Sequence, residues 1–506
     1  MKTVYKNSVL FVMILILTII PVAGCKTNTP ENIEKTDSSV FDSNATEPDT
    51  ITETKPLYYA ADYLPDITYG GYEFRVVTPP NGAYSMMSLE IEIEEETGDI
   101  LFDAIYKRNR IIEEKYDIVF KGTVLGDVWA CLGGFQKSVR AGSDDFDLCT
   151  LLPRDAWAQA LEGTIVPVNR LPYLDITQPW YAHDVNSQIS IGGKYFFVYS
   201  DECLNMFEGT SCVMFNKNLV KDLGFEDMYN LVKTNKWTVD QFFSYAKTAT
   251  ADLDGDGVMT EADRYGIVAI DSELFPPFWV ASGNKNVSKD ENDMHIFTGQ
   301  NEKMYSILDK IYENLFTGQI IYFNGYDSKS KLFGNDPLQV SAMQFASGFG
   351  LFHVDGLKSI PLLRSMEADF GVLPIPKYDE KQEKYYSPSG RGWLNCAPVT
   401  TPDLQRTSII MEILAVESKN YTLPAYIEIM LRTKYARDEE SEEMLDIIYN
   451  GRTLDLGETF YWPVIGTMYE QTLHNKNNNF VSVVEKNLDK INNAIQKANE
   501  TALSLD

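Results

Sequence analysis

The sequence predicts an α/β protein, and two observations support this class. From about residue 70 onward, short β-rich segments alternate with segments of helical periodicity. The composition is that of a globular chain, with 44% apolar, 12% aromatic and 23% charged residues. At 506 residues the chain is too long for one ordinary hydrophobic core, so two or three domains are expected.

The alternation is clearest in the first part of the folded chain. Runs of β-branched and aromatic residues predict strands, and apolar residues three or four positions apart predict helices. The expected strands are 74–78, 118–124 and 146–151, and the expected helices end at Tyr116, follow Asp127 and span 155–161. Such alternation is typical of a mostly parallel sheet covered by helices.

The turn after the third expected strand, 152–155, is a candidate ligand contact. Ligands of open α/β sheets bind at the carboxyl ends of the strands, and this turn contains Arg154 and Asp155. The alternative interpretation is a helix start that carries a solvated ion pair.

Later segments predict further scaffold. Two consecutive glycines, Gly192 and Gly193, predict a hairpin-like turn that leads into an aromatic strand at 194–200. Thr238 and Gln241 have the spacing of a capping box, which marks the start of a helix. Amphipathic helices are also expected at 302–314 and close to the C-terminus.

The N-terminus has the pattern of a secretory signal. Two lysines precede an apolar stretch, 9–20, that is too short to span a bilayer. The small residues before Cys25 resemble the lipobox of bacterial lipoproteins, which implies that 1–24 is removed and that Cys25 is lipidated and anchors the protein outside the cell membrane. Residues 25–56 are polar and predict a flexible tether. An uncleaved anchor and ordinary secretion are the alternatives.

Charge and cysteine content narrow the functional classes. The net charge of −29 repels nucleic acid and anionic lipid, so nucleic-acid binding is excluded. With Cys25 lipidated, five of the six cysteines remain, and none forms a CxxC motif. A disulfide between Cys203 and Cys212 is one alternative, but buried free thiols are the favoured interpretation.

One loop has the spacing of an EF-hand calcium loop. Oxygen ligands are expected at the first, third, fifth, seventh and twelfth positions, with a glycine at the sixth for the sharp turn. The matching ligands are Asp252, Asp254, Asp256, the Val258 carbonyl and Asp263. A flexible shell of hard oxygens favours Ca²⁺, and a single loop favours a structural clamp within 252–263. The alternative is an acidic surface turn, and the short twelfth residue reaches a metal less easily than glutamate does.

No catalytic motif stands beside this loop. The four histidines form no HExxH motif, and the chain has neither a GxSxG motif nor a P-loop. The sequence therefore predicts a protein that is not an enzyme and has no catalytic residues.

Several short phrases are spread over the chain, at 98–116, 171–181, 215–219, 236–238, 263–266, 370–377 and 434–438. In their order and spacing they resemble the extracellular solute-binding proteins of family 1, the lipoprotein components of bacterial ABC importers that mostly serve carbohydrates.

The resemblance implies a two-lobed periplasmic-binding-protein-like fold of type II, with a ligand cleft between the lobes. Lobe one is expected at 70–203 plus 377–435, and lobe two at 204–376 plus 436–506. Hinge closure then captures a carbohydrate, expected to be an oligosaccharide, and the closed monomer delivers it to the permease. Two alternatives remain: a cell-surface carbohydrate-active enzyme and a ligand-sensing partner of a membrane receptor.

The resemblance also implies a set of ligand-binding residues by similarity of position. Aromatic rings would pack on sugar C–H faces, and fixed polar groups would bind hydroxyls. The set is Arg154, Asp155, Asp201, Glu202, Phe278, Trp279, Asp355, Arg391, Trp393, Tyr461 and Trp462. Arg391 adds a positive charge to this set, so an anionic sugar is an alternative ligand. For each aromatic residue the alternative is packing in the core.

Overall fold

The structure is a computed structural model. It describes residues 58–89, 91–317, 320–323, 330–334, 337–432 and 439–504, all within one compact unit that begins at Tyr58. The expected signal segment, the tether and Cys25 lie outside the described residues. Within the described ranges, no helix has the length and apolar character needed to cross a bilayer.

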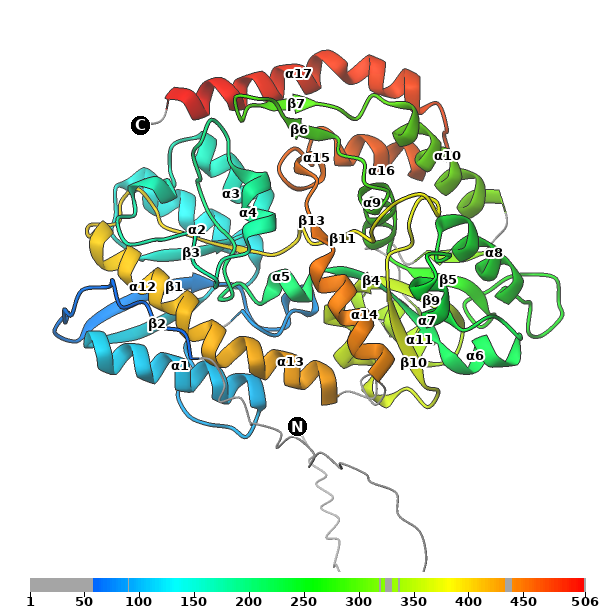
Figure 1. Ribbon diagram of the computed structural model, residues 1–506, viewed down its shortest axis with the longest axis horizontal. Coiled ribbons are helices and arrows are strands. Elements are labelled where there is room, and N and C mark those ends of the chain that lie inside the picture. Colours follow the sequence, from blue (N-terminus) through cyan, green and yellow to red (C-terminus); the bar gives the residue numbers. More distant parts are fainter. Residues whose placement is uncertain are drawn as a thin grey trace, which may run out of the picture. The chain divides into compact units, whose positions relative to one another are not determined.

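The first lobe is built on a four-stranded sheet in the order β12-β3-β1-β2 (Figure 1). The strands are β1 (Tyr72–Thr78), β2 (Ile118–Val124), β3 (Leu148–Leu151) and β12 (Leu394–Cys396). The first three are parallel and β12 is antiparallel to β3. The helices of this lobe are α1 (Ile100–Tyr116), α2 (Val128–Ala141), α3 (Pro153–Leu161), α4 (His183–Ile189), α12 (Leu404–Glu417) and α13 (Leu423–Arg432).

Local sequence explains where the helices of the first lobe begin. The Asp99 carboxylate accepts hydrogen bonds from the backbone N–H groups of Leu101 and Phe102, both at 3.0 Å, and so caps α1. Asp127 caps α2 in the same way, through the Ala130 N–H. Both helices follow the predicted βα alternation, which confirms the α/β class.

The second lobe has a five-stranded sheet in the order β10-β4-β9-β5-β8. The strands are β4 (Ser211–Asn216), β5 (Tyr265–Ala269), β8 (Ile321–Phe323), β9 (Gly350–Gly356) and β10 (Phe370–Pro374). β5 is parallel to β8 and β9, whereas β4 is antiparallel to β9 and β10. The helices are α6 (Lys217–Asp222), α7 (Met228–Lys233), α8 (Val239–Ala249), α9 (Asp271–Ala281), α10 (Glu302–Thr317), α11 (Pro337–Ala346) and α14 (Glu439–Asn450).

The predicted helix start at Thr238 is confirmed. Its hydroxyl accepts a hydrogen bond from the Gln241 N–H at 3.3 Å, and α8 follows at once. Trp237 is buried, contacts Phe242 edge to face, and donates its indole N–H to the Pro374 carbonyl. These residues fasten α8 to the sheet and are scaffold.

The predicted strand at 194–200 is wrong, although the turn before it is present. Gly192 and Gly193 have positive φ values, and Ile191 and Lys194 form an isolated bridge across them. The following residues pair with other backbone only at single points, such as the isolated bridge between Tyr181 and Ser200 and the bond from the Ala182 N–H to the Tyr199 carbonyl. The amide of Asn186 on α4 also binds both the N–H and the carbonyl of Tyr199. A side chain thus adds to these single backbone contacts where a continuous strand partner is missing.

Two strands lie between the lobes. β11 (Ser387–Pro388) and β13 (Arg452–Thr453) form a short parallel pair there, and the chain also crosses through α5 (Asn205–Glu208) (Figure 1). The loop before β11 still packs on the second lobe, because Gln382 donates to the Ala281 carbonyl at 2.9 Å. The chain therefore returns to the first lobe just before β12.

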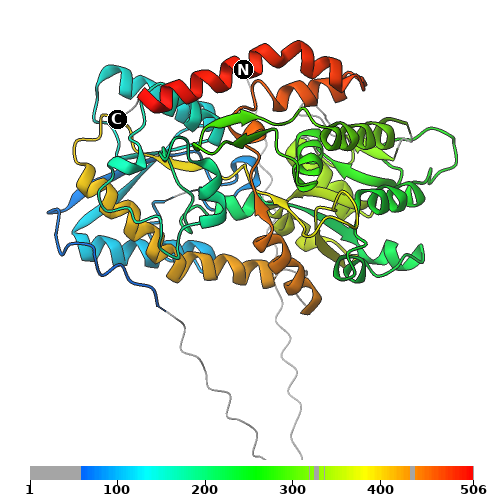
Figure 2. The same ribbon diagram turned by 45° about the horizontal axis from the view of Figure 1, so that its top comes forward.

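The C-terminal part contacts both lobes. It comprises α15 (Leu456–Thr459), α16 (Gly466–His474) and α17 (Phe480–Ser504), with the hairpin β6 (Val287–Lys289) and β7 (His295–Phe297) beneath α17 (Figures 1 and 2). Trp157 of the first lobe stacks on Phe460 at 4.9 Å, and Lys194 donates to the Ala502 carbonyl. One buried cluster accordingly runs through both lobes.

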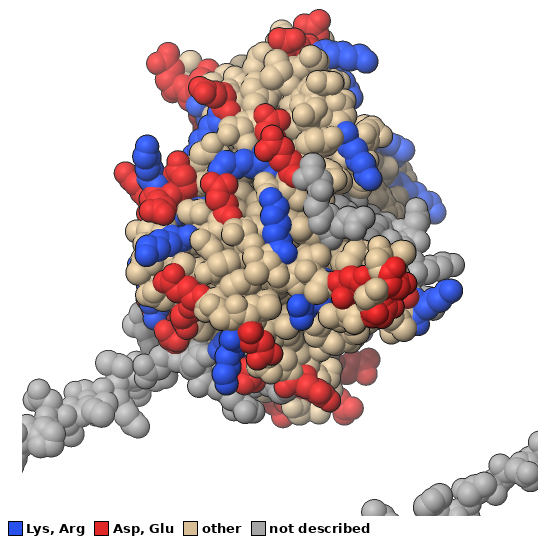
Figure 3. Space-filling view, turned by 90° about the vertical axis from the view of Figure 1, so that its right-hand side faces the viewer, with Lys and Arg blue, Asp and Glu red and all other residues tan. Residues whose placement is uncertain are grey.

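The five cysteines among the described residues are free and buried, which confirms the favoured interpretation. Figure 3 shows one side of the second lobe, where acidic side chains gather in several groups among scattered lysines and arginines. This pattern agrees with the negative net charge of the chain.

Candidate ligand-binding site

A cavity of about 550 Å³ lies between the lobes. Its walls come from the loop before α1, the start of α2, the β3–α3 turn, α9, the crossing segments and the C-terminal part. The side chains that carry its chemistry are Tyr84, Trp129, Arg154, Glu273, Lys358, Arg391, Trp393, Glu458, Trp462 and Glu470. The cavity has an aromatic end and a charged end.

Arg154 is the centre of the aromatic end. It stands at the carboxyl end of β3, where the sequence analysis expected a ligand contact, and its guanidinium carbon lies 5.0 Å from the ring centroids of both Trp129 and Trp462. Trp129 is 54% exposed. Among the described residues the nearest carboxylate oxygen, from Asp155, is 3.7 Å from Nε, so the terminal amino groups of Arg154 are available for a ligand.

Two further rings extend this apolar surface. Tyr84 and Trp393 contact edge to face, with centroids 6.0 Å apart. The Trp393 side chain is almost fully buried, and its backbone N–H donates to the Asn205 side chain at 2.6 Å, which fixes the crossing segment beside the cavity. Four aromatic residues from separate segments thus line one cavity.

Glu273 organises the charged end. Its carboxylate lies 2.7 Å from Arg391 and 3.1 Å from Lys358, and Asp355 is 3.5 Å from the same lysine. Burial alone would raise the pKa of Glu273, but the positive charges of Arg391 and Lys358 outweigh it and lower the pKa. Arg391 is therefore balanced by an acid of the protein itself and does not require an anionic sugar.

Glu458 is the second acid of this end. Burial, with the negative charge of Glu470 added, raises its pKa well above the ordinary value. Its Oε2 atom is buried and has no hydrogen-bond partner among the described residues. A methyl group at Gly466 would clash with Trp462 and lie 2.8 Å from that atom, so a larger residue there would displace both side chains. A protonated Glu458 offers the cavity both a donor and an acceptor.

The structure brings together four of the predicted ligand-binding residues. Arg154, Arg391, Trp393 and Trp462 line the cavity directly. Two others act through a neighbour, since Asp155 lies beside Arg154 and Asp355 contacts Lys358.

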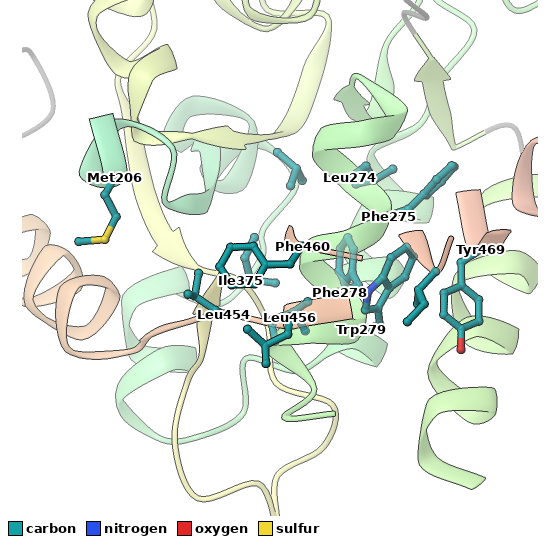
Figure 4. Close-up of a cluster of buried hydrophobic side chains, with 14 of the residues drawn as sticks. Met206, Leu274, Phe275, Phe278, Trp279, Ile375, Leu454, Leu456, Phe460 and Tyr469 are labelled. Atoms are coloured by element: carbon teal, nitrogen blue, oxygen red, sulfur yellow. The ribbon is translucent and has the colours of Figure 1, made fainter. Parts of the chain in front are cut away.

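Phe278 and Trp279 do not line the cavity, which corrects the expectation. Both are fully buried in the core of the second lobe, where Trp279 packs on Tyr469 (Figure 4). The reason is helical geometry, because neighbouring residues of a helix point in different directions. α9 presents Pro276, Pro277 and Val280 to the cavity instead.

Three other expected residues are structural. Tyr461 is buried, and its hydroxyl is 2.9 Å from His295 Nδ1. Asp201 forms an ion pair with Lys419 at 2.8 Å. Glu202 accepts a hydrogen bond from the Asn395 side chain at 2.7 Å. These contacts hold the crossing and C-terminal segments in place, outside the cavity.

Sequence reasoning missed Tyr84, Trp129, Glu273 and Glu458. For Trp129 a signal was present, because a tryptophan two residues after a helix cap, close to the carboxyl end of β2, stands where ligands of such sheets bind. The other three belong to segments without a motif, and only the packing of the lobes places them together.

The expected calcium loop is exposed and separate from the cavity. Oxygen atoms of Asp252, Asp254 and Asp256 lie within 4.8 Å of one another. The two backbone N–H groups that bind Asp252 come from Gly255 and Gly257, whose φ values are positive. Asp263 is not part of this group, because both its carboxylate oxygens accept backbone N–H groups of the loop, from Leu253 and Thr260.

The fold and the cleft define a two-lobed periplasmic-binding-protein fold of the α/β class. The sequence matches no protein-family model and no curated protein sequence. Solved structures share the fold over most of the chain.

Three similar structures illustrate this likeness. The galacto-N-biose/lacto-N-biose I-binding protein of the ABC transporter from Bifidobacterium longum, bound to lacto-N-biose, has a TM-score of 0.57 at 13% identity and covers 86% of this chain and 96% of its own. UgpB from Mycobacterium tuberculosis, in complex with glycerophosphocholine, has a TM-score of 0.55 at 14% identity, and the match covers 86% of this chain and 99% of UgpB. MalE from Bdellovibrio bacteriovorus, bound to maltotriose, has a TM-score of 0.52 at 12% identity, with 85% and 99% covered.

Proposed function

We propose that this protein is a solute-binding protein that captures a carbohydrate, an oligosaccharide, between its lobes and delivers it to the permease of an ABC importer. The observation that carries the proposal is the aromatic end of an inter-lobe cavity, with Arg154 held between Trp129 and Trp462. Two similar structures hold lacto-N-biose and maltotriose.

The chemistry of the cavity suits a sugar. The exposed face of Trp129 offers an apolar surface for the C–H side of a pyranose ring. Arg154 and Glu458 offer donors and acceptors for hydroxyl groups. A cavity of about 550 Å³ falls within the ordinary range of ligand sites.

Closure is the proposed mechanism of capture. Trp129 and Arg154 belong to the first lobe, whereas Trp462 follows α15 in the C-terminal part. Contact across the cavity therefore depends on the relative position of these segments, and a bound sugar that touches both would favour the closed arrangement.

The proposal includes an anchored, extracellular location. Lipidation of Cys25 after removal of 1–24 would tether the folded monomer to the outer face of the cell membrane through residues 25–56. Metabolic labelling with a fatty-acid analogue tests this step, and Cys25→Ser is expected to abolish the label.

We also propose that 252–263 binds Ca²⁺ as a structural clamp. Three carboxylates with oxygens within 4.8 Å form a hard, oxygen-rich donor set, to which the Val258 carbonyl would add. Asp263 would support the loop through the backbone N–H groups of Leu253 and Thr260 rather than serve as a ligand in its present orientation.

A thermal-shift screen tests the function. The mature, unlipidated protein is heated with mono- and oligosaccharides, uronic acids, peptides and polyamines, and the ligand is recovered afterwards. A glycan at about 100 times its Kd is expected to stabilise the fold by about 2.7 kcal/mol and to return intact. Stabilisation only by a non-sugar would contradict the carbohydrate assignment, and a cleaved glycan would indicate an enzyme.

A further inference from the structure

A second cavity, of about 310 Å³, adjoins the ligand cavity and shares only Val280 and Thr453 with it. We call it the hinge cavity. It is lined by Gln188 of α4 in the first lobe, by Lys285 after α9 in the second lobe, by Lys384 in the loop before β11, and by Arg452 of the crossing strand β13. Its walls therefore come from both lobes and from the strands that join them.

The hinge cavity is positively charged in a strongly acidic chain. Three cations line it, Lys285, Lys384 and Arg452, against one acid, Asp184, which is exposed. The whole chain has a net charge of −29. A local excess of positive charge in a concave site attracts anions.

Arg452 lines this cavity and has one donor without a partner among the described residues. Its guanidinium carbon lies 4.0 Å from the ring centroid of Tyr449 and 4.6 Å from that of Phe207, and its Nε donates to the Tyr449 carbonyl. Its Nη1 atom is buried and has no hydrogen-bond partner among the described residues. A buried donor without an acceptor is costly, so a ligand oxygen that reached this atom would remove that cost.

The two lysines complete a cationic wall. Lys384 packs its ammonium group over the ring of Tyr386 at 5.2 Å and has no ion pair with the described residues. Lys285 donates to the Gln188 side-chain oxygen at 2.6 Å, an atom that also accepts from Thr453. Burial lowers the pKa of Lys285, Asp455 opposes this effect, and the positive charges of Lys289 and Lys384 add to it.

We propose that the hinge cavity binds a small oxyanion, a carboxylate, sulfate or phosphate group, through Arg452 and Lys384 with Lys285 beside them. Planar guanidinium and ammonium donors suit such groups. Because the lining residues come from both lobes, the anion stabilises the arrangement of lobes seen in this structure. The site is independent of the proposed sugar cavity.

Thermal unfolding with sodium sulfate, phosphate, citrate or chloride at one ionic strength tests this site. At least one oxyanion is expected to raise Tm by about 2–5 °C above the chloride value, with saturation. Lys384→Gln changes an exposed side chain, leaves the fold intact and is expected to weaken binding of the anion at least fivefold. Arg452→Gln is expected to abolish the rise in Tm that the anion causes.

Two controls locate the effect. Lys381→Gln removes an exposed lysine three residues away from Lys384 and is expected to leave the anion-induced rise in Tm unchanged. Arg154→Gln is also expected to leave that rise unchanged if the anion binds outside the sugar cavity. If no oxyanion raises Tm more than chloride does, the proposal is overturned. A shift that survives both Lys384→Gln and Arg452→Gln, or that disappears with Arg154→Gln, also overturns it.

Discussion

The two ends of the ligand cavity differ in how their charges are balanced. At the aromatic end, Arg154 is held between two tryptophan rings, with its nearest carboxylate at 3.7 Å. At the charged end, Arg391 and Lys358 share the buried Glu273. The protein therefore neutralises Arg391 and Lys358 with its own acid, whereas it leaves Arg154 for a ligand. Substitutions at the charged end should affect stability most, and substitutions at the aromatic end should affect binding most.

The largest expected effect is that of Glu273→Ala. It leaves Arg391 and Lys358 without their shared acid, so we expect a loss of about 3–5 kcal/mol in the free energy of unfolding. Denaturant unfolding measures it, with the exposed Glu367→Ala in the same lobe as the control. A loss below about 1 kcal/mol would remove the contrast between the two ends.

Trp129→Ala tests the other end. Half of this ring is exposed, so we expect less than about 1 kcal/mol of destabilisation but at least about tenfold weaker binding of the glycan found in the screen. Calorimetric titration measures the binding. Tyr106→Ala, on α1 and outside the cavity, is the matched control. Equal affinity of Trp129→Ala and the unaltered protein would show that the aromatic end does not hold the ligand.

Glu458→Gln examines the pH dependence of the charged end. Burial and the negative charge of Glu470 raise the folded-state pKa of Glu458 above the ordinary 4.5. The protonated carboxyl therefore makes its full contribution to stability below about pH 4.5, and this contribution is lost as pH rises through the folded-state pKa. The variant should thus be more stable at pH 7, by about 1 kcal/mol or more. This gain should vanish near pH 4.5, as measured by Tm between pH 4 and 8. A gain independent of pH would contradict the electrostatic cause.

Asp254→Ala gives the smallest expected effect and compares the cavity with a site formed inside one loop. We expect Ca²⁺ to raise Tm of the unaltered protein by a few degrees and to leave the variant unchanged. Asp145→Ala, an exposed acid of the first lobe, serves as the control. Identical melting curves with Ca²⁺ and with a chelator would rule out a folded-state metal site.

Local patterns predicted much of the scaffold. The strands near 74–78 and 118–124 and the helix after Thr238 all exist. Each depends on periodicity or on a cap within a few residues, which is information that the sequence carries directly. The strand expected at 194–200 is absent, because a strand needs a continuous partner, and this segment has only isolated backbone contacts together with the Asn186 amide.

The residues that line the cavity were predicted only in part, because their positions also depend on contacts outside their own segment. Arg154 was found because it follows a strand at the edge where ligands bind, and Trp462 and Arg391 through resemblance. Phe278 and Trp279 were misplaced because their neighbours Pro276, Pro277 and Val280 occupy the face of α9 that meets the cavity. The orientation of one helix decides this, and a sequence does not reveal it.

By itself, the sequence determined the α/β class, the helix caps and the acidic loop at 252–263, since each arises from the chemistry of adjacent residues. The tertiary structure alone decided that Trp129 and Trp462, 333 positions apart in the chain, enclose one arginine, and that Glu273 neutralises Arg391. Contacts between distant segments depend on how the lobes and the C-terminal part pack, and that packing is the sum of many weak interactions spread over the whole chain.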